Sequence, residues 1–280
     1  MSDQGDITDV KAQLLAAVSG DGARSSRSQA GDRASTSDLS IDEVLLLHSI
    51  NWEPLDLVCG VSFTSIPQGV WRWGDGEVSY ASAAHAQAIA SAVSRMEHEC
   101  LRVEGHGVVG VHIELEIEPH HIKAVLVGTA VRPLGSPGRS PQPFVSDLST
   151  RDFTLLHNAG WEPVGLAFGA SFMHAPRRTA ASAVAQKSQN FELTNFTEAM
   201  YTARELAMER MQSSALRMKS QGVVAVQISE GPMHFAHHAV RFTAWGTAVR
   251  LGRDGHKFLQ PRMILPLDDT VVAFDASSLR

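Results

Sequence analysis

The chain of 280 residues lacks the features that mark several large classes of protein. It has only two cysteines, Cys59 and Cys100, too few for the disulfide framework of a secreted protein and in keeping with a reducing compartment. No apolar run approaches the ~20 residues of a membrane span, and the polar, acidic N-terminus differs from a signal peptide. The formal net charge of -6, without a Lys/Arg cluster, argues against nucleic-acid binding. We therefore expect a cytoplasmic protein with no nucleic-acid or membrane partner.

The sequence motifs of common enzyme classes are also missing. There is no Gly-x-Ser-x-Gly elbow, no Walker loop, no Gly-x-Gly-x-x-Gly after a predicted strand and no His-Glu-x-x-His helix. The paired acids Glu97 with Glu99, and Asp268 with Asp269, are interpreted as solvated. An enzyme would need a site assembled between chains. We predict a non-enzymatic protein.

What the sequence does contain is an internal repeat, in which residues 37–132 recur in diverged form at 146–250. The first half of the repeat aligns at a single offset of 109 residues, and the second copy is longer after that. The matches include Trp52-Glu53-Pro54 with Trp161-Glu162-Pro163, Gly107-Val108-Val109 with Gly222-Val223-Val224, and Gly128-Thr129-Ala130-Val131 with Gly246-Thr247-Ala248-Val249.

The repeat divides the chain into two modules of a size that can bury a core, with tails and a linker around them. Composition marks the tail and the linker, because Gly, Ser and Pro favour neither a packed core nor regular structure. We predict a disordered N-terminal tail at 1–36, a first module at 37–132, a Pro/Gly-rich linker at 133–145, a second module at 146–250 and a C-terminal extension at 251–280.

Each module is predicted to consist of a short helix, a strand, a long helix and two further strands. Ser40 and Glu43 have capping-box spacing at the start of the first short helix. In the second long helix, Asn195 with Glu198 is a candidate cap, and a buried stripe is expected at Phe196, Met200, Ala203, Ala207 and Met211. The expected strands are 55–65, 108–117 and 123–131 in the first module and 164–173, 223–229 and 240–249 in the second, with long helices at 80–103 and 193–218.

The order of these elements, with Gly60 on the first strand and a closing Gly-Thr-Ala-Val strand in both copies, resembles the YbjQ family, which carries the label of a heavy-metal-binding domain. Ala203-Arg204-Glu205 ahead of Met211 resembles the helix of that family, whereas the first copy has Ala88-Ile89-Ala90 there. The resemblance implies an α+β fold of two tandem YbjQ-like modules, each with its helix packed on a small antiparallel sheet. It also implies assembly into pentameric rings.

A ring of five modules cannot be made from whole two-module chains, because five is odd. If the ring symmetry of the family holds, five chains would form two stacked rings as a homo-oligomer. The alternative is that the two modules pair inside one chain and close off the surfaces that would otherwise form a ring.

Two pairs of adjacent histidines are the candidate ligands of a transition metal ion: His120 with His121, and His237 with His238. Each pair is expected in a turn between the last two strands of its module. The neighbouring His112, Glu114 and Glu116, followed by Glu118, are interpreted as an acidic, solvated strand face. The cysteines are interpreted as small buried apolar residues, with a soft-metal thiolate pair as the alternative.

Trp71 and Trp73 share a strand face in our interpretation, either in a core or seam between modules or as an exposed anchor for a partner. The Arg177-Arg178 pair is interpreted as surface, with an anion-binding role as the alternative. The function we predict is that of an oligomeric binding or scaffold protein that holds a heavy or transition metal ion. The alternatives are a metal-free module for protein interaction and an enzyme with its site between subunits.

Overall fold

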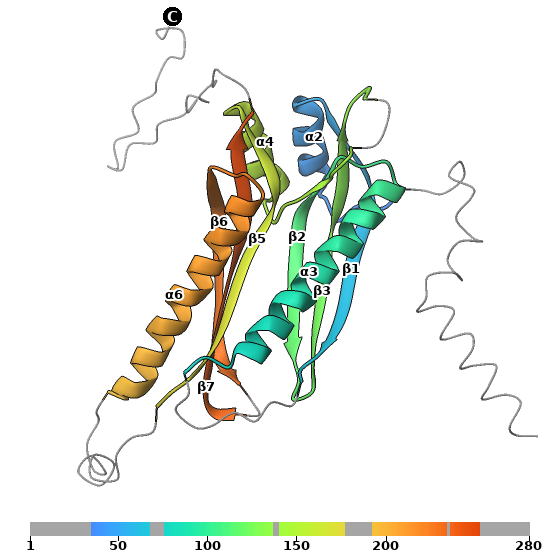
Figure 1. Ribbon diagram of the computed structural model, residues 1–280. Coiled ribbons are helices and arrows are strands. Elements are labelled where there is room, and N and C mark those ends of the chain that lie inside the picture. The colour runs from blue at the N-terminus through green and yellow to red at the C-terminus, as the bar shows by residue number, and fades with distance from the viewer. Residues whose placement is uncertain (1–34, 68–75, 137–139, 177–191, 234–235, 253–280) are drawn as a thin grey trace, which may run out of the picture. The chain divides into compact units, whose positions relative to one another are not determined.

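The computed structural model describes residues 35–67, 76–136, 140–176, 192–233 and 236–252. Each module follows the predicted order of short helix, strand, long helix, strand, strand, so the α+β fold with two tandem modules is confirmed (Figure 1). The first module comprises α2 (Ile41–Ser49), β1 (Trp52–Ser65), α3 (Ser79–Arg102), β2 (Gly107–Ile117) and β3 (His121–Pro133). The second comprises α4 (Thr150–Asn158), β5 (Trp161–His174), α6 (Thr194–Arg217), β6 (Gly222–Met233) and β7 (Ala236–Leu251), and the short β4 (Phe144–Val145) precedes it.

In both sheets the last strand of the module lies between the other two. The strand orders are β1-β3-β2-β4 and β5-β7-β6, and all pairs are antiparallel except β2 with β4. Equivalent registers open the two sheets, since Trp52 pairs with Pro133 and Trp161 with Leu251. The closing Gly-Thr-Ala-Val segment of each copy lies on this central strand and is buried, with Ala130 and Ala248 in the apolar cores.

Glycine permits the long helix of each module to approach its sheet closely. A Cβ atom on Gly60 would lie 2.0 Å from the Ala92 carbonyl oxygen, and one on Gly169 would lie 2.1 Å from that of Ala207. Any side chain at either of these two equivalent positions would force the helix away from the sheet. The predicted apolar stripe of α6 faces the sheet: Ala203, Ala207 and Met211 are buried, and Phe196 and Met200 pack against them.

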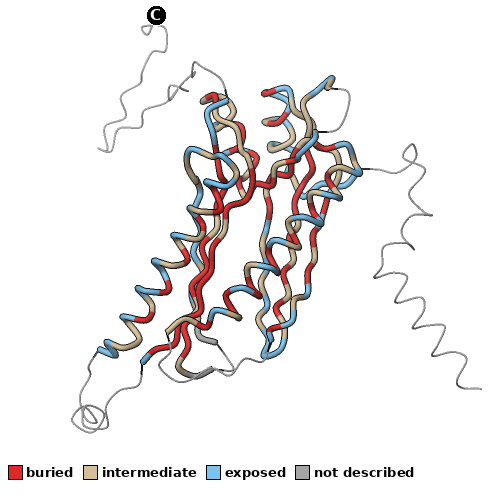
Figure 2. Tube along the Cα trace, in the orientation of Figure 1, coloured by how far each residue is buried: buried red, intermediate tan, exposed pale blue. Residues whose placement is uncertain are grey.

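The two first strands differ in how far they are covered. On β1, burial alternates between Leu57 and Phe63, which is typical of a sheet with one covered face. On β5, nearly every residue from Gly165 to His174 is buried (Figure 2). One face of β5 packs against α6, and the other packs against the first module.

The helix starts agree only partly with the sequence pattern. Ser40 and Glu43 form the predicted capping box at the start of α2. The cap predicted for α6 is wrong: the helix follows Leu193 without a side-chain cap, and Asn195 donates to the Pro176 carbonyl instead. The Asn195 side chain thus bonds to a carbonyl earlier in the chain and leaves the backbone amides at the helix start uncapped.

Several predicted features fall outside the described residues. These are the N-terminal tail up to residue 34, Trp71 and Trp73, the Arg177-Arg178 pair, and the chain beyond residue 252. Among the described residues, no helix is both long and apolar enough to cross a membrane.

Candidate functional site

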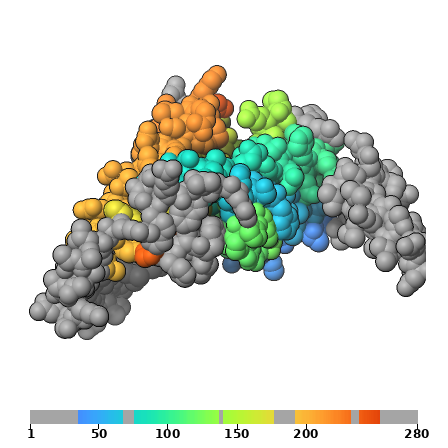
Figure 3. All heavy atoms as spheres, turned by 60° about the horizontal axis from the view of Figure 1, so that its bottom comes forward, coloured from blue at the N-terminus to red at the C-terminus, as the bar shows by residue number. Residues whose placement is uncertain are grey.

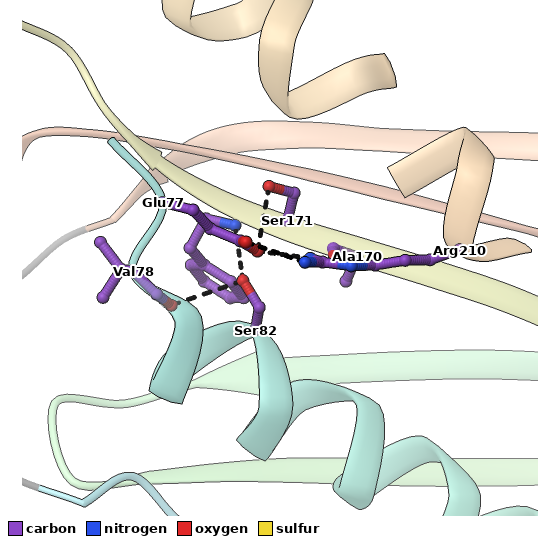
Figure 4. Close-up of polar contacts among 7 residues, drawn as sticks. Glu77, Val78, Ser82, Ala170, Ser171 and Arg210 are labelled. Carbon is purple, nitrogen blue, oxygen red and sulfur yellow. Dashed lines mark hydrogen bonds and ion pairs between the residues drawn. The ribbon is translucent and has the colours of Figure 1, made fainter. Parts of the chain in front are cut away.

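The most extensive polar site lies where the two modules meet; we call this contact the seam. It joins the start of α3 and the edge of β2, from the first module, to residues 144–148, β5 and α6. At its centre, the Arg210 guanidinium forms a two-pronged ion pair with Glu77, with an Nη2–Oε2 distance of 2.8 Å (Figure 4). Ser171 donates to the same carboxylate at 3.5 Å, and Arg210 also donates to the Ala170 carbonyl at 2.7 Å.

Backbone hydrogen bonds hold the same region together. The Val78 amide donates to the Phe172 carbonyl at 2.7 Å, and the Phe172 amide donates to Ser82 Oγ at 3.0 Å. Glu77 and Met173 form an antiparallel bridge. The first residues before α3 thus pair with β5 as a short extra strand would.

The electrostatics of the seam favour an ionised Glu77. Burial alone would raise the pKa of its carboxyl, but the hydrogen bonds from Arg210, Ser82 and Ser171 and the charge of Arg210 outweigh this effect. The pKa of Glu77 therefore lies below its ordinary value. The same pair raises the pKa of Arg210, so both groups stay charged at neutral pH.

An apolar contact lies behind the ion pair. His85 on α3 is fully buried, with its ring 5.7 Å from that of Phe172 and its Nε2 atom 3.4 Å from Thr243 Oγ1. Burial, aided by the charge of Arg241, lowers the pKa of His85 to about 3, so its imidazole is neutral. Leu166 and Phe172 belong to the core that α3 forms with the first sheet.

Residues 144–148 form the third part of the seam. The Ser146 amide donates to the Val108 carbonyl at 3.0 Å, and the Val111 amide donates back to Ser146 at 3.1 Å, so this segment extends the β2 edge. Ser146 Oγ lies 2.9 Å from Thr247 Oγ1 of the second module. Burial raises the pKa of the Asp147 carboxyl although Thr247 donates to it.

A groove of about 520 Å³ runs along the seam between the two long helices. The space-filling view shows α3 in teal beside α6 in orange (Figure 3). The lining of the groove mixes small apolar residues with polar ones, among them Ser79, Gln87, Ala170, Arg210, Ser213 and Arg217.

The predicted histidine ligands occupy different kinds of position. His120 lies exposed in the turn before β3, and His121 begins that strand with its ring 5.9 Å from that of Phe63. His237 and His238 lie in β7 rather than in a turn, and the side chain of His237 is outside the described part. The expectation of a turn holds for His120, whereas His121 opens a strand and the second pair lies within one.

The two histidine pairs are also one residue out of register. The His120 carbonyl accepts from the Ile66 amide at 2.8 Å, and the equivalent bond joins Ala175 to the His238 carbonyl at 2.7 Å. His120 and His238 are therefore equivalent, whereas their neighbours in each pair are not. Within the described ranges, no three His, Cys, Asp or Glu side chains gather closely enough to hold a metal ion. Zinc normally takes four ligands, so the described residues alone do not complete a zinc site.

The cysteines differ from each other in exposure. Cys100 is fully buried, and burial together with the charge of Glu97 raises the pKa of its thiol to about 12. Cys59 is exposed, which corrects the expectation that both cysteines are buried. It lies on the face of β1 that points away from α3, where the equivalent residue of the second module is Phe168.

Comparison with known proteins agrees with this architecture. A family model described as "Putative heavy-metal-binding", that of YbjQ, matches residues 171–252, from β5 to the end of the second module. An encapsulin nanocompartment protein of Mycobacterium tuberculosis (strain ATCC 25618 / H37Rv) is 35% identical over 252 residues, which cover 87% of this chain and 96% of that protein. This chain belongs to the YbjQ family. No solved structure matches the chain significantly. The first YbjQ-like module lies outside the family match and is related to the second by the repeat and the shared fold.

The seam was not found by the sequence patterns. Its ion pair joins residues 133 positions apart, and neither Glu77 nor Arg210 belongs to a motif. A signal was present in the repeat itself, since Arg210 aligns with Arg95 and Glu77 with Glu192. A charged residue kept in both copies at equivalent helix positions is a reason to look for a shared contact.

Proposed function

We propose that this protein is a non-enzymatic scaffold that assembles with copies of itself. The seam carries the proposal, because it joins one YbjQ-like module to the next through an ion pair, backbone hydrogen bonds and a continuous apolar core. These contacts are made by different surfaces of the two modules, and such contacts repeat when more copies are present. The relative named as an encapsulin nanocompartment protein aligns over nearly its whole length, which supports a role in a larger protein assembly.

The solution mass of the full-length, tag-free chain tests this proposal. One chain has a mass of 30.2 kDa. Light scattering coupled to size-exclusion chromatography, with the protein at about 1 to 100 µM, should give a multiple of that mass, because scaffold interfaces are stable in this range. A mass of one chain throughout would reject a self-assembling scaffold and favour a module that binds a different protein.

Metal binding at His120 and His121 is a second candidate function. It is supported by two adjacent imidazoles, with His120 exposed before β3 and His121 at the start of that strand, and by the description of the family. Because two ligands do not complete a typical site, an ion there would need further ligands besides these two histidines. Elemental analysis of the oligomer peak should find a stoichiometric transition metal that is lost in a His120→Ala, His121→Ala variant. Equal metal content in both proteins would reject these ligands without affecting the scaffold proposal.

A further inference from the structure

Each module carries a copy of the surfaces that the other one uses in the seam. The first module contributes the start of α3 and the β2 edge. The other side of the seam consists of residues 144–148, Arg210 and the face of β5 that points away from α6, which we call its outer face. The second module has the same kind of helix start at α6 and the same strand edge at β6. The first module has the equivalent face of β1, which points away from α3, and residues 37–39. The long helices begin at Ser79 and Thr194. When these two starts are aligned, Glu77 is equivalent to Glu192, and Arg95 is equivalent to Arg210.

Arg95 occupies the position equivalent to that of Arg210 but lacks an acidic partner like Glu77 among the described residues. Its guanidinium donates to the Val61 carbonyl on β1, as that of Arg210 donates to Ala170 on β5. Within the part of the chain that the structure describes, Arg95 forms no ion pair, whereas Arg210 binds Glu77. The first module therefore presents half of an ion pair beside the outer face of β1.

Glu192 presents the complementary half at the start of α6. Thr197 Oγ1 donates to its carboxylate at 2.8 Å, just as the equivalent Ser82 hydrogen-bonds to Glu77. Across the described ranges of the chain, Glu192 has no cationic partner. Two charges of opposite sign are thus held by the same local contacts that hold the ion pair of the seam.

Apolar residues show the same difference between the two copies. Those buried in the seam have equivalents in the other module that are exposed. A phenylalanine or leucine left exposed on a strand face costs solubility unless a partner covers it. The exposed fractions are 0% for Phe172 but 65% for Phe63, 4% for Leu166 but 41% for Leu57, and 6% for Val78 but 42% for Leu193.

The strand edges differ in the same way. On β2, Val108 and Val111 are buried beneath residues 144–148, whereas on β6 the equivalent of Val111, Val226, is 39% exposed. The segment that would cover β6 is also exposed: Ser146 is fully buried, and its equivalent Ser37 is exposed. An exposed strand edge in one module, and in the other an exposed segment equivalent to the one that covers this edge in the seam, indicate that the two pair between copies.

We infer that the second module of one chain docks on the first module of another and repeats the seam. Glu192 of one chain pairs with Arg95 of the next, the start of α6 covers Phe63 and Leu57, and residues 37–39 extend the β6 edge. The partner is a second copy of this chain, because every element of the docking surface matches an element already used within it. This inference rests on the proposed self-assembly and specifies its interface.

The two docking surfaces differ, so the interface is heterologous and generates a closed ring or an open fibre. Both modules of a chain then lie in the same ring or fibre, rather than in two stacked rings. A ring of whole chains has an even number of modules.

Charge reversal tests the interface. The variants Glu192→Arg and Arg95→Glu each place like charges at the contact and should weaken association by roughly tenfold or more. The double variant Glu192→Arg, Arg95→Glu restores opposite charges and should regain the mass of the wild-type oligomer. An equimolar mixture of the two single variants should also assemble, since alternating chains match every charge. An odd-numbered ring would block full alternation, so the mixture also reports the parity of the ring.

Arg95→Glu also removes the bond to Val61, so a second variant is needed in case the first fails to fold. Phe63→Glu changes an exposed side chain and should block docking while leaving the circular dichroism spectrum unchanged. Arg151→Glu is the matched control for Arg95→Glu, because it makes the same charge change at an exposed position of α4. The control should keep the oligomer intact.

The outcomes separate the two proposals. A monomeric wild-type chain would overturn both the scaffold and this interface. A wild-type oligomer whose mass is unchanged by Glu192→Arg and Phe63→Glu would overturn the interface and leave the scaffold standing. Loss of assembly in both folded variants, with rescue by the double charge reversal, supports the interface.

Discussion

Arg210 on α6 forms an ion pair with Glu77 just before α3, although the two residues are 133 positions apart in the sequence. The pair therefore joins a helix of the second module to a helix of the first. The planar guanidinium suits this task, because it binds both carboxylate oxygens and still donates to the Ala170 carbonyl. One side chain thus links α3, β5 and α6. The seam is therefore a specific joint between modules, and its loss should be measurable.

We expect Glu77→Gln to lower the free energy of unfolding by about 1 to 2 kcal/mol at pH 7. A charged hydrogen bond of this kind contributes ~1.5 to 3 kcal/mol, and the partial exposure of Arg210 reduces that amount. Because the pKa of Glu77 is lowered in the folded chain, its stabilisation is present above the unfolded pKa and disappears as pH falls through the folded pKa. Urea unfolding at pH 7 and near pH 3 should show the difference between variant and wild type shrinking.

Glu162→Gln serves as the control for this experiment. Its carboxylate lies 3.8 Å from Arg250, and both side chains are about half exposed. A surface pair of this kind contributes at most ~1 kcal/mol. Equal effects of the two substitutions at pH 7 would show that the seam ion pair contributes no more than an ordinary surface pair.

His85 should make the chain less stable in weak acid. Its pKa of about 3 in the folded chain lies far below the ordinary value of 6.5, so only the unfolded chain binds the proton between these values. Stability should therefore rise with pH across this window, by up to ~1.4 kcal/mol per pH unit. His85→Met, which introduces the residue found at the equivalent Met200, should flatten the dependence between pH 6 and 4. Urea unfolding across this range measures it, and an unchanged slope in the variant would assign the pH dependence to other groups.

Much of the fold could be predicted because its signals are local. Apolar periodicity located α6, capping chemistry located α2, and the repeat showed that an element found in one module has a counterpart in the other. Tertiary context overrode local preference at Asn195, whose side chain bonds to Pro176 instead of capping the helix. The turn predicted for His237 and His238 was wrong for a related reason, because β7 extends through both residues and the His238 carbonyl accepts a bond from Ala175.

The seam could not be predicted, because its parts are brought together only by the docking of two modules. Phe172 is buried, whereas its equivalent Phe63 is exposed. Both residues occupy the same sequence pattern, and the difference depends only on what covers each strand face. Cys59 was misjudged for this reason too. Its apolar counterpart in the second module suggested a core position, whereas the structure places it on an open face.

Adding a methyl group at Gly60 should strongly destabilise the chain. The new Cβ would overlap the Ala92 carbonyl, and because the nearest atoms belong to backbone, the helix has to move away from the sheet. We expect Gly60→Ala to cost about 3 kcal/mol, at the upper end for overpacked cores. Thermal and urea unfolding measure the loss. Gly222→Ala is the control, because nothing lies within 4 Å of its added Cβ, and a similar loss there would point to a general strand effect instead.

Alkylation of the two thiols should report assembly directly. At pH 8 the exposed Cys59 should react with iodoacetamide, whereas Cys100 should stay unmodified, because it is buried and the thiolate, not the thiol, is the nucleophile. Cys59 lies on the face of β1 that docking covers, so its labelling rate should fall as concentration rises through the assembly range. Peptide mass spectrometry follows both sites, and labelling in urea provides the full-exposure reference. A Cys59 rate that is independent of concentration, in samples whose mass shows assembly, would exclude this face from the interface.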